Sequence, residues 1–272
     1  MKKMEYYPDF PYAIERIDGR VFVGGNEALW EWKGKKWEKV LDKGIERFRQ
    51  FPEFPLLAIG REGVFYYQDG WKELLSSYRY SPNPLNGFIR YEVSFLPELT
   101  FYSPEKQLVA IGTYTDRFPN ESEINEHIYF ITPDLRVEKL GKSEGEELLR
   151  DGNWYSYYDG EIGYYDGKVY KGGKVVFEVS KGDRILSLKN TPKGYFAVGW
   201  NIKEQKPVLC LSQDAETWEK IDLPVRQNTT TFYDLLYDEK NDEFIVLSND
   251  DVYFFPSQEI EELRERSTHR GR

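Results

Sequence analysis

Short runs in which apolar or aromatic residues alternate with polar ones cover most of the chain, and many of these runs end at a polar or glycine-containing turn. Alternation over four to eight residues is the pattern of a half-buried β-strand. In the clearest example, at 208–223, the polar turn Gln213–Glu216 separates two such runs, and Trp218 begins the second. This stretch predicts a β-hairpin with a tryptophan next to its turn.

Similar hairpins recur along the chain, which indicates an internal repeat. They occupy residues 29–41, 64–75, 128–140, 169–179 and 208–223, with a shorter copy at 252–257. Most copies follow an apolar strand that ends near a small residue, and a further apolar or aromatic strand lies upstream. The repeat unit is therefore a four-stranded antiparallel sheet. It recurs at roughly the 40–50 residues that are typical of one propeller blade.

We predict an all-β fold: a single β-propeller of six four-stranded blades over residues 1–258, followed by a short C-terminal helix and a basic tail over residues 259–272. Asp-Gly and Gly-Gly pairs such as Asp69-Gly70 and Gly172-Gly173 supply the positive φ angles that tight hairpin turns need. Seven blades are the alternative. A β-sandwich uses similar turns but accommodates six matched hairpins poorly.

The sixth repeat lacks a fourth strand, because Pro256 and the predicted helix follow its third. The segment Lys3–Tyr7 has no other assignment. We predict that it pairs with the strand at Val252–Phe255, so that no sheet edge is left open. A further short helix is predicted after residue 143, where Ser143 and Glu146 have the spacing of a capping box.

Three tryptophans, Trp37, Trp71 and Trp218, follow equivalent turns in their hairpins. A tryptophan at this position folds back over the hairpin and buries its ring while the indole N–H stays near an acceptor. We therefore expect all three rings to pack in or between the outer strands of their blades.

The hairpin turn of the fifth repeat also carries a motif. Ser212, Asp214, Thr217 and Trp218 resemble the Asp-box (S-x-D-x-G-x-T-W) of sialidase-like (BNR) propeller repeats, although the segment is one residue shorter and lacks the glycine. The resemblance implies a propeller built from such repeats, in which the residues of the box are structural.

Sialidase-like propellers also bind a substrate carboxylate with three arginines, the first of which lies in a Phe-Arg-Ile-Pro motif. Residues Phe48–Pro52 are similar to that motif, but this segment is one residue longer and lies in the second repeat. Arg90 and Arg184 are further candidates that no motif supports. The resemblance thus concerns the repeat architecture and does not extend to the sialidase site.

The formal net charge of −10 disfavours nucleic acid and anionic membranes as partners. No apolar run approaches the roughly 18 residues of a membrane span. The first residues carry lysines but no apolar signal-peptide region, so we expect a cytoplasmic protein. Plentiful Lys and Glu with modest Asn and Gln are typical of a thermophilic source.

Few residues offer metal or nucleophilic chemistry. Cys210 is the single cysteine and is expected to be a small buried hydrophobe. His127 and His269 are the only histidines, and no phosphate-binding or dinucleotide motif occurs. We therefore predict no catalytic residue, no metal site and no cofactor.

Long loops on a rigid scaffold are the usual carriers of function. The longest predicted loops, 76–90 and 113–126, lie on the side of the blades that carries the connections between second and third strands. They are rich in the aromatic residues and arginines that are typical of recognition surfaces. The predicted partner-binding residues are Tyr78, Arg79, Tyr80, Arg90, Asp116, Arg117 and Glu123.

These observations favour a non-enzymatic scaffold that binds a protein or another macromolecule through its long-loop face. The alternative is a carbohydrate-active enzyme, glycoside hydrolase or sialidase-like, with acidic residues at the channel mouth. A third hypothesis is a structural subunit of a larger assembly. Carboxylates clustered across the channel would favour the enzyme, and an aromatic patch outside the channel would favour binding.

Overall fold

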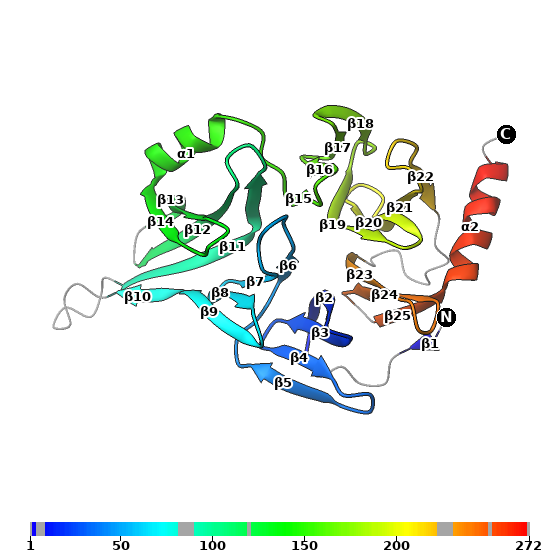
Figure 1. The fold of residues 1–272 in the computed structure, drawn as a ribbon, viewed down its shortest axis with the longest axis horizontal. Coiled ribbons are helices and arrows are strands. Elements are labelled where there is room, and N and C mark those ends of the chain that lie inside the picture. Colours follow the sequence, from blue (N-terminus) through cyan, green and yellow to red (C-terminus); the bar gives the residue numbers. More distant parts are fainter. Residues whose placement is uncertain are drawn as a thin grey trace. The chain divides into compact units, whose positions relative to one another are not determined.

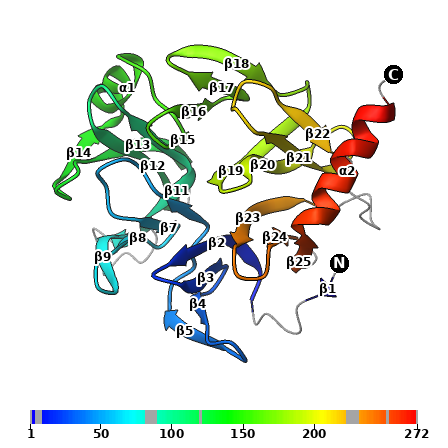
Figure 2. The same ribbon diagram turned by 45° about the vertical axis from the view of Figure 1, so that its right-hand side comes forward.

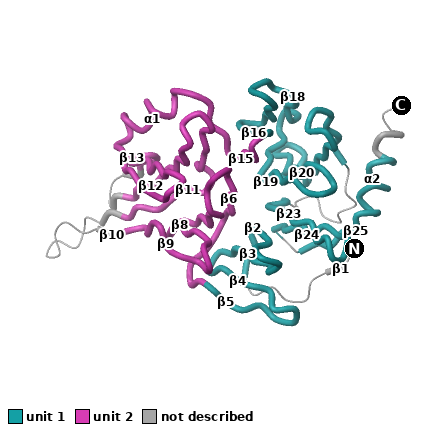
Figure 3. Tube along the Cα trace, in the orientation of Figure 1, with its two compact units in different colours: residues 1–40, 161–272 teal, residues 41–160 magenta. Residues whose placement is uncertain are grey.

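The computed structural model describes residues 2–3, 9–80, 90–118, 121–221, 231–249 and 252–270. These residues form six antiparallel sheets and two helices (Figure 1). The chain divides into two compact units, Met1–Val40 with Glu161–Arg272 and Leu41–Gly160, which Figure 3 shows in separate colours.

Each of the first two blades is a four-stranded sheet whose strands follow one another in chain order. The first blade contains β2 (Pro11–Ile17), β3 (Arg20–Gly25), β4 (Leu29–Trp32) and β5 (Trp37–Leu41). The second contains β6 (Arg47–Arg49), β7 (Leu57–Gly60), β8 (Gly63–Tyr67) and β9 (Trp71–Ser76).

The third blade has one strand more than the others. Its sheet has the order β10-β11-β12-β13-β14 and contains β10 (Tyr78–Tyr80), β11 (Arg90–Ser103), β12 (Leu108–Phe118), β13 (Glu121–Ile131) and β14 (Val137–Gly141). Helix α1 (Lys142–Arg150) follows β14 directly.

The fourth and fifth blades return to four strands in chain order. The fourth contains β15 (Tyr157–Tyr158), β16 (Ile162–Tyr165), β17 (Lys168–Lys171) and β18 (Lys174–Glu178). The fifth contains β19 (Asp183–Thr191), β20 (Gly194–Asn201), β21 (Lys206–Ser212) and β22 (Glu219–Ile221). The predicted class, a β-propeller of six four-stranded blades, is confirmed.

The sixth blade takes its outer strand from the other end of the chain. Its own strands are β23 (Phe232–Asp238), β24 (Glu243–Ser248) and β25 (Val252–Pro256), and β1 (Lys2–Lys3) completes the order β1-β25-β24-β23. Lys3 pairs with Tyr253, which confirms the predicted pairing at this residue. Residues 4–8 lie outside the described part of the chain.

The C-terminal helix α2 (Ser257–Arg270) packs on β22 and β25 (Figure 2). Ile260 is buried in the cluster that also contains Phe255, and Arg264 donates two hydrogen bonds to the carboxylate of Glu219, at 2.8 and 3.1 Å. Ile260 and Arg264 therefore attach the helix to the fifth and sixth blades.

Each unit has apolar cores of its own. In the second unit, Leu57, Ile59, Phe95, Val109 and Ile111 belong to one buried cluster, because the strands of the second and third blades turn alternate side chains toward each other. In the first unit, a cluster from the fifth and sixth blades extends onto α2.

Each hairpin tryptophan packs against another aromatic ring, although the ring that Trp71 contacts lies on the first strand of its blade and not on an outer one. The ring of Trp218 stacks on Phe177 of β18, with centroids 5.3 Å apart and planes 16° apart. Trp37 opens β5 and contacts Trp32, while Trp71 opens β9 and contacts Phe48.

Two local predictions were wrong. Residues 113–126 are not a loop, because β12 continues to Phe118 and β13 begins at Glu121. The capping box at Ser143 is also absent. Helix α1 begins one residue earlier, at Lys142, and its N-cap residue Gly141 has no side chain to accept a hydrogen bond.

Candidate functional site

The seven predicted partner-binding residues lie in a single sheet. Tyr78, Arg79 and Tyr80 form β10, Arg90 begins β11, Asp116 and Arg117 lie on β12, and Glu123 lies on β13. The two segments that the sequence predicted as separate loops are thus joined by strand pairing. The side chains of Arg79, Tyr80, Arg90 and Arg117 lie outside the described part of the structure.

We call this part of the sheet the blade-three extension: β10 together with residues 90–95, 113–118 and 121–126. Bulges separate it from the rest of the blade, between Phe95 and Thr100 on β11 and between Gly112 and Tyr114 on β12. Strand β12 is 11 residues long, whereas its counterparts β3 and β7 have 6 and 4. The other blades therefore form without such an extension.

The two faces of the extension differ. Val93, Phe95 and Thr115 on one face are almost completely buried. The opposite face carries a row of cross-strand neighbours, Ser94, Tyr114 and Ile124. Ile124 is 55% exposed, and among the described residues it is the most exposed large apolar side chain. A solvent-facing isoleucine marks this face as a candidate contact surface.

Two lysines of β14 and α1 contact the buried face of the extension. The ammonium of Lys139 donates a hydrogen bond to the Tyr78 hydroxyl at 3.1 Å and lies 5.2 Å from the centre of the Tyr78 ring. The ammonium of Lys142 lies 3.2 Å from Oε1 of Glu123. Tyr78 and Glu123 therefore contribute to holding the extension against the blade.

The pKa of Lys139 reflects these contacts. Burial acts to lower it, but the hydrogen bond to Tyr78 and the nearby Tyr129 outweigh burial, so that the pKa is raised above its ordinary value. The ring of Tyr129 also lies against the ammonium, at 5.9 Å. Lys139 thus stays charged and keeps its cation–π contacts at neutral pH.

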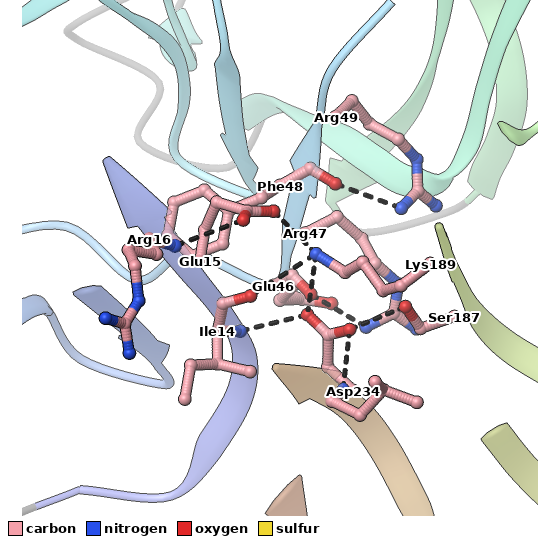
Figure 4. A network of polar contacts seen from close by, with 11 residues as sticks. Ile14, Glu15, Arg16, Glu46, Arg47, Phe48, Arg49, Ser187, Lys189 and Asp234 are labelled. Atoms are coloured by element: carbon pink, nitrogen blue, oxygen red, sulfur yellow. Dashed lines mark hydrogen bonds and ion pairs between the residues drawn. The ribbon is translucent and has the colours of Figure 1, made fainter. Parts of the chain in front are cut away.

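A second cluster of polar residues lies in the first unit, on the neighbouring strands β2, β19 and β23 (Figure 4). Asp234 is buried and accepts hydrogen bonds from the backbone N–H of Ile14 at 2.9 Å and from the hydroxyl of Ser187 at 2.5 Å. The ammonium of Lys189 lies 2.6 Å from Glu15 Oε2 and 3.8 Å from Asp234 Oδ2. We call these residues the charged network.

The charged network joins the first, fifth and sixth blades through hydrogen bonds and ion pairs. Lys189 also donates to the carbonyl of Ile14 at 3.3 Å, so both carboxylates and the backbone share one ammonium. Arg16, two residues along β2, forms an ion pair with Asp238 at 2.8 Å. These contacts link β2, β19 and β23 to one another.

The three arginines that the sequence singled out lie on three different strands. Arg49 of the Phe48–Pro52 segment donates to the backbone carbonyl of Phe48 at 3.2 Å. Arg184 lies on β19 with an exposed side chain, and Arg90 begins β11 in the extension.

Sequence reasoning missed Asp234, Lys189 and Lys139. The signal for Asp234 was present, since an aspartate inside the apolar run Phe232–Tyr237 must either face solvent or be paired. No local signal connects Lys139 with Tyr78, because 61 residues separate them in the chain.

The motif of the fifth blade has a structural role. The Asp214 carboxylate accepts hydrogen bonds from the backbone N–H groups of Thr217 at 2.7 Å and Glu216 at 2.8 Å, and from the Ser212 hydroxyl at 3.0 Å. The two backbone donors lower the pKa of Asp214 to about 2. All these partners belong to the turn itself, so Asp214 closes the hairpin.

Within the described residues, no cluster of three or more His, Cys, Asp or Glu side chains is placed to bind a metal ion. Neither of the described helices is long and apolar enough to cross a membrane.

No protein-family model and no curated protein matches the chain. Among solved structures, it is similar to the extracellular domain of a one-component system from B. thetaiotaomicron, with 12% identity, a TM-score of 0.46, and coverage of 92% of this chain and 41% of that one. It spans about two fifths of each of the first two structures it matches.

Two further similar structures are covered nearly completely. One is a Thermus thermophilus protein described as an oxidoreductase (glucose dehydrogenase), with 10% identity, a TM-score of 0.43, and coverage of 88% of this chain and 90% of that one. The other is a GH43 β-1,3-galactosidase, with 10% identity, a TM-score of 0.34, and coverage of 94% of each chain. With these scores, the similarities say nothing about what this chain binds or catalyses.

Proposed function

We propose that the chain is a non-catalytic β-propeller that binds a protein partner through the exposed face of the blade-three extension. The observation that carries this proposal is the row Ser94–Tyr114–Ile124, in which an isoleucine and a tyrosine lie side by side on a sheet that reaches beyond its blade. Aromatic and large apolar side chains that come out of water on binding supply most of the affinity of protein interfaces.

The edge of the extension offers a second mode of contact. β10 is the end strand of its sheet, and among the described residues it pairs with β11 alone. An end strand can accept an additional strand from a partner through main-chain hydrogen bonds. A partner that lies across the exposed row could therefore also pair with β10.

The alternative function, carbohydrate hydrolysis, is less well supported by the charged network. A glycosidase needs one protonated carboxyl group and one ionised carboxylate at opposite sides of the sugar bond. Glu15 and Asp234 instead converge on the ammonium of Lys189, at 2.6 and 3.8 Å, so both carboxylates are engaged in ion pairs within the protein. We expect these carboxylates to hold the blades together and not to catalyse hydrolysis.

The proposal is tested by affinity capture from the native host with the variant Ile124→Glu. We expect partner recovery to fall at least tenfold, which corresponds to about 1.4 kcal/mol. The melting temperature should change by no more than about 2 °C, because the side chain is exposed. The matched control is Val175→Glu on β18, where an apolar side chain is 50% exposed in an outer strand.

Wild-type recovery by Ile124→Glu would overturn the proposal. So would an equal loss with Val175→Glu, since that outcome would mean that any new charge on the surface weakens capture. Cytoplasmic location and a thermophilic source stay predictions from the sequence.

A further inference from the structure

A cavity of about 130 Å³ lies in the first unit, between the sheet of the first blade and the sheet of the sixth. Its apolar lining comes from both sheets and includes Ile14, Val23, Ile245, Leu247 and Val252, which belong to one buried cluster. Cavities of about 150 Å³ with apolar walls take up ligands the size of benzene. The space therefore suits a molecule of comparable size.

One wall of the cavity is aromatic. Trp32 and Trp37 line it with ring centroids 5.1 Å apart and planes 50° apart, so the two rings form a corner. Phe254 of β25 adds a third ring to the lining. The faces of indole rings carry negative electrostatic potential and attract cations, tryptophan most strongly among the aromatic side chains.

The polar residues of the lining are acidic or neutral. They are Asp238, Asn241 and Glu243, and Asp238 and Glu243 are direct cross-strand neighbours on β23 and β24. Two carboxylates in this position repel each other unless cations offset them. Asp238 forms an ion pair with Arg16 at 2.8 Å and accepts a hydrogen bond from the side chain of Asn241 at 2.8 Å.

We propose that this cavity binds a small organic cation, an alkylammonium group about the size of trimethylammonium. Its methyl groups would fill the apolar floor, its positive charge would face Trp32 and Trp37, and the carboxylates of Asp238 and Glu243 would complement that charge. An anion does not fit the same combination, because both charged residues of the lining are acidic. The proposal is independent of the blade-three extension.

The test compares two probes of the same shape on the full-length protein: choline and its uncharged carbon analogue 3,3-dimethylbutan-1-ol. Binding is followed by calorimetry and by the indole N–H signals in NMR spectra. We expect choline to bind at least tenfold more tightly than the alcohol and to shift the signals of Trp32 and Trp37. Equal affinity of the two probes, or no saturable binding of choline, would overturn the proposal.

Two variants locate the site and separate its contributions. Trp32→Leu keeps an apolar wall but removes a π face, so choline binding should weaken about tenfold while binding of the alcohol changes little. Glu243→Gln should weaken choline binding severalfold. Its control is Glu239→Gln, an exposed carboxylate on the turn between β23 and β24 that does not line the cavity. An equal effect of Glu239→Gln would show that only the overall charge matters and would overturn the proposed site.

Discussion

The third and fifth blades start from the same four-stranded plan and end their strands differently. In the fifth, Asn201 lies two residues after Gly199, and its side-chain oxygen accepts hydrogen bonds from the N–H groups of Lys203 at 2.9 Å and Glu204 at 2.8 Å. This turn ends β20. In the third, Tyr114 lies two residues after Gly112 and makes no such turn, so β12 continues to Phe118.

The difference separates residues that stabilise a blade from residues that are exposed to a partner. In the fifth blade, the polar side chains at strand ends bind one another: Asn201 donates to Asp183 at 2.6 Å, and Lys220 donates to the same carboxylate at 2.9 Å. In the third, the strands extend past the point where the blade is complete, and Tyr114 and Ile124 occupy the exposed face. The fifth blade is thus closed by its own contacts, and the third presents a surface.

The largest expected effect belongs to the fifth blade. Trp218→Ala should lower the free energy of unfolding by about 3 kcal/mol, because it removes the stacking on Phe177 and leaves a void. It also removes the hydrogen bond from the indole N–H to the Ala215 carbonyl at 2.9 Å. Urea unfolding measures the change. A loss below about 1 kcal/mol, which is ordinary for a surface position, would mean that this tryptophan does not anchor the hairpin.

The second prediction concerns the turn that ends β20. Asn201→Ala removes the acceptor of two backbone N–H groups and the donor to buried Asp183, and should cost about 1–2 kcal/mol in urea unfolding. The matched change in the third blade, Tyr114→Ala, should cost less, because Tyr114 does not form this turn. If Tyr114→Ala were the more destabilising of the two, the distinction between the blades would fail.

The sequence was most informative where apolar residues alternate. The hairpins at 29–41 and 208–223 and the C-terminal helix, with its Glu262–Arg266 pair at 3.5 Å, could all be predicted because their pattern is local. The strands of the extension could not. Their buried face includes Thr113 and Thr115, which count as polar in an alternation although β-branched threonine is favourable in strands.

The sequence indicated which segments form the candidate site, but it did not show that these segments pair as strands of one sheet. The aromatic and arginine content of residues 76–90 pointed to a recognition surface, and those residues do share a sheet with 113–126. The pairing itself depends on contacts between distant segments, such as Tyr78 with Val93, that no single stretch encodes. Ile124, the most exposed apolar side chain of that sheet, was hidden in a segment predicted as a charged loop.

A third prediction removes the extension. Replacing Thr115–Glu123 with Asn-Gly would join Tyr114 to Ile124, which are cross-strand partners, by a two-residue hairpin turn. We expect the free energy of unfolding to fall by about 1 kcal/mol, because buried Thr115 and the contact of Glu123 with Lys142 are lost while the rest of the blade is kept, and partner capture to be lost. Cooperative unfolding at a much lower urea concentration would show instead that the third blade needs its long strands.

The smallest expected effect distinguishes the hairpin turns of the two blades by pH. The turn between β13 and β14 holds Asp134, whose pKa is lowered mainly by a hydrogen bond from the Thr132 hydroxyl, whereas two backbone N–H groups lower that of Asp214 to about 2. A carboxyl group whose pKa is depressed by folding contributes stability that is complete above its unfolded pKa, which is 3.8 here, and is lost as the pH falls toward the folded value. The contribution of Asp214 should therefore disappear between about pH 4 and pH 2.

In Asp214→Asn the amide oxygen can accept the same backbone hydrogen bonds at every pH, so the variant should lose less stability than the wild type over this range. Carboxyl NMR titration should place the midpoint of Asp214 near 2 and that of Asp134 below its ordinary value. If Asp214 titrated at the ordinary value of an exposed aspartate, its carboxylate would not be closing the turn.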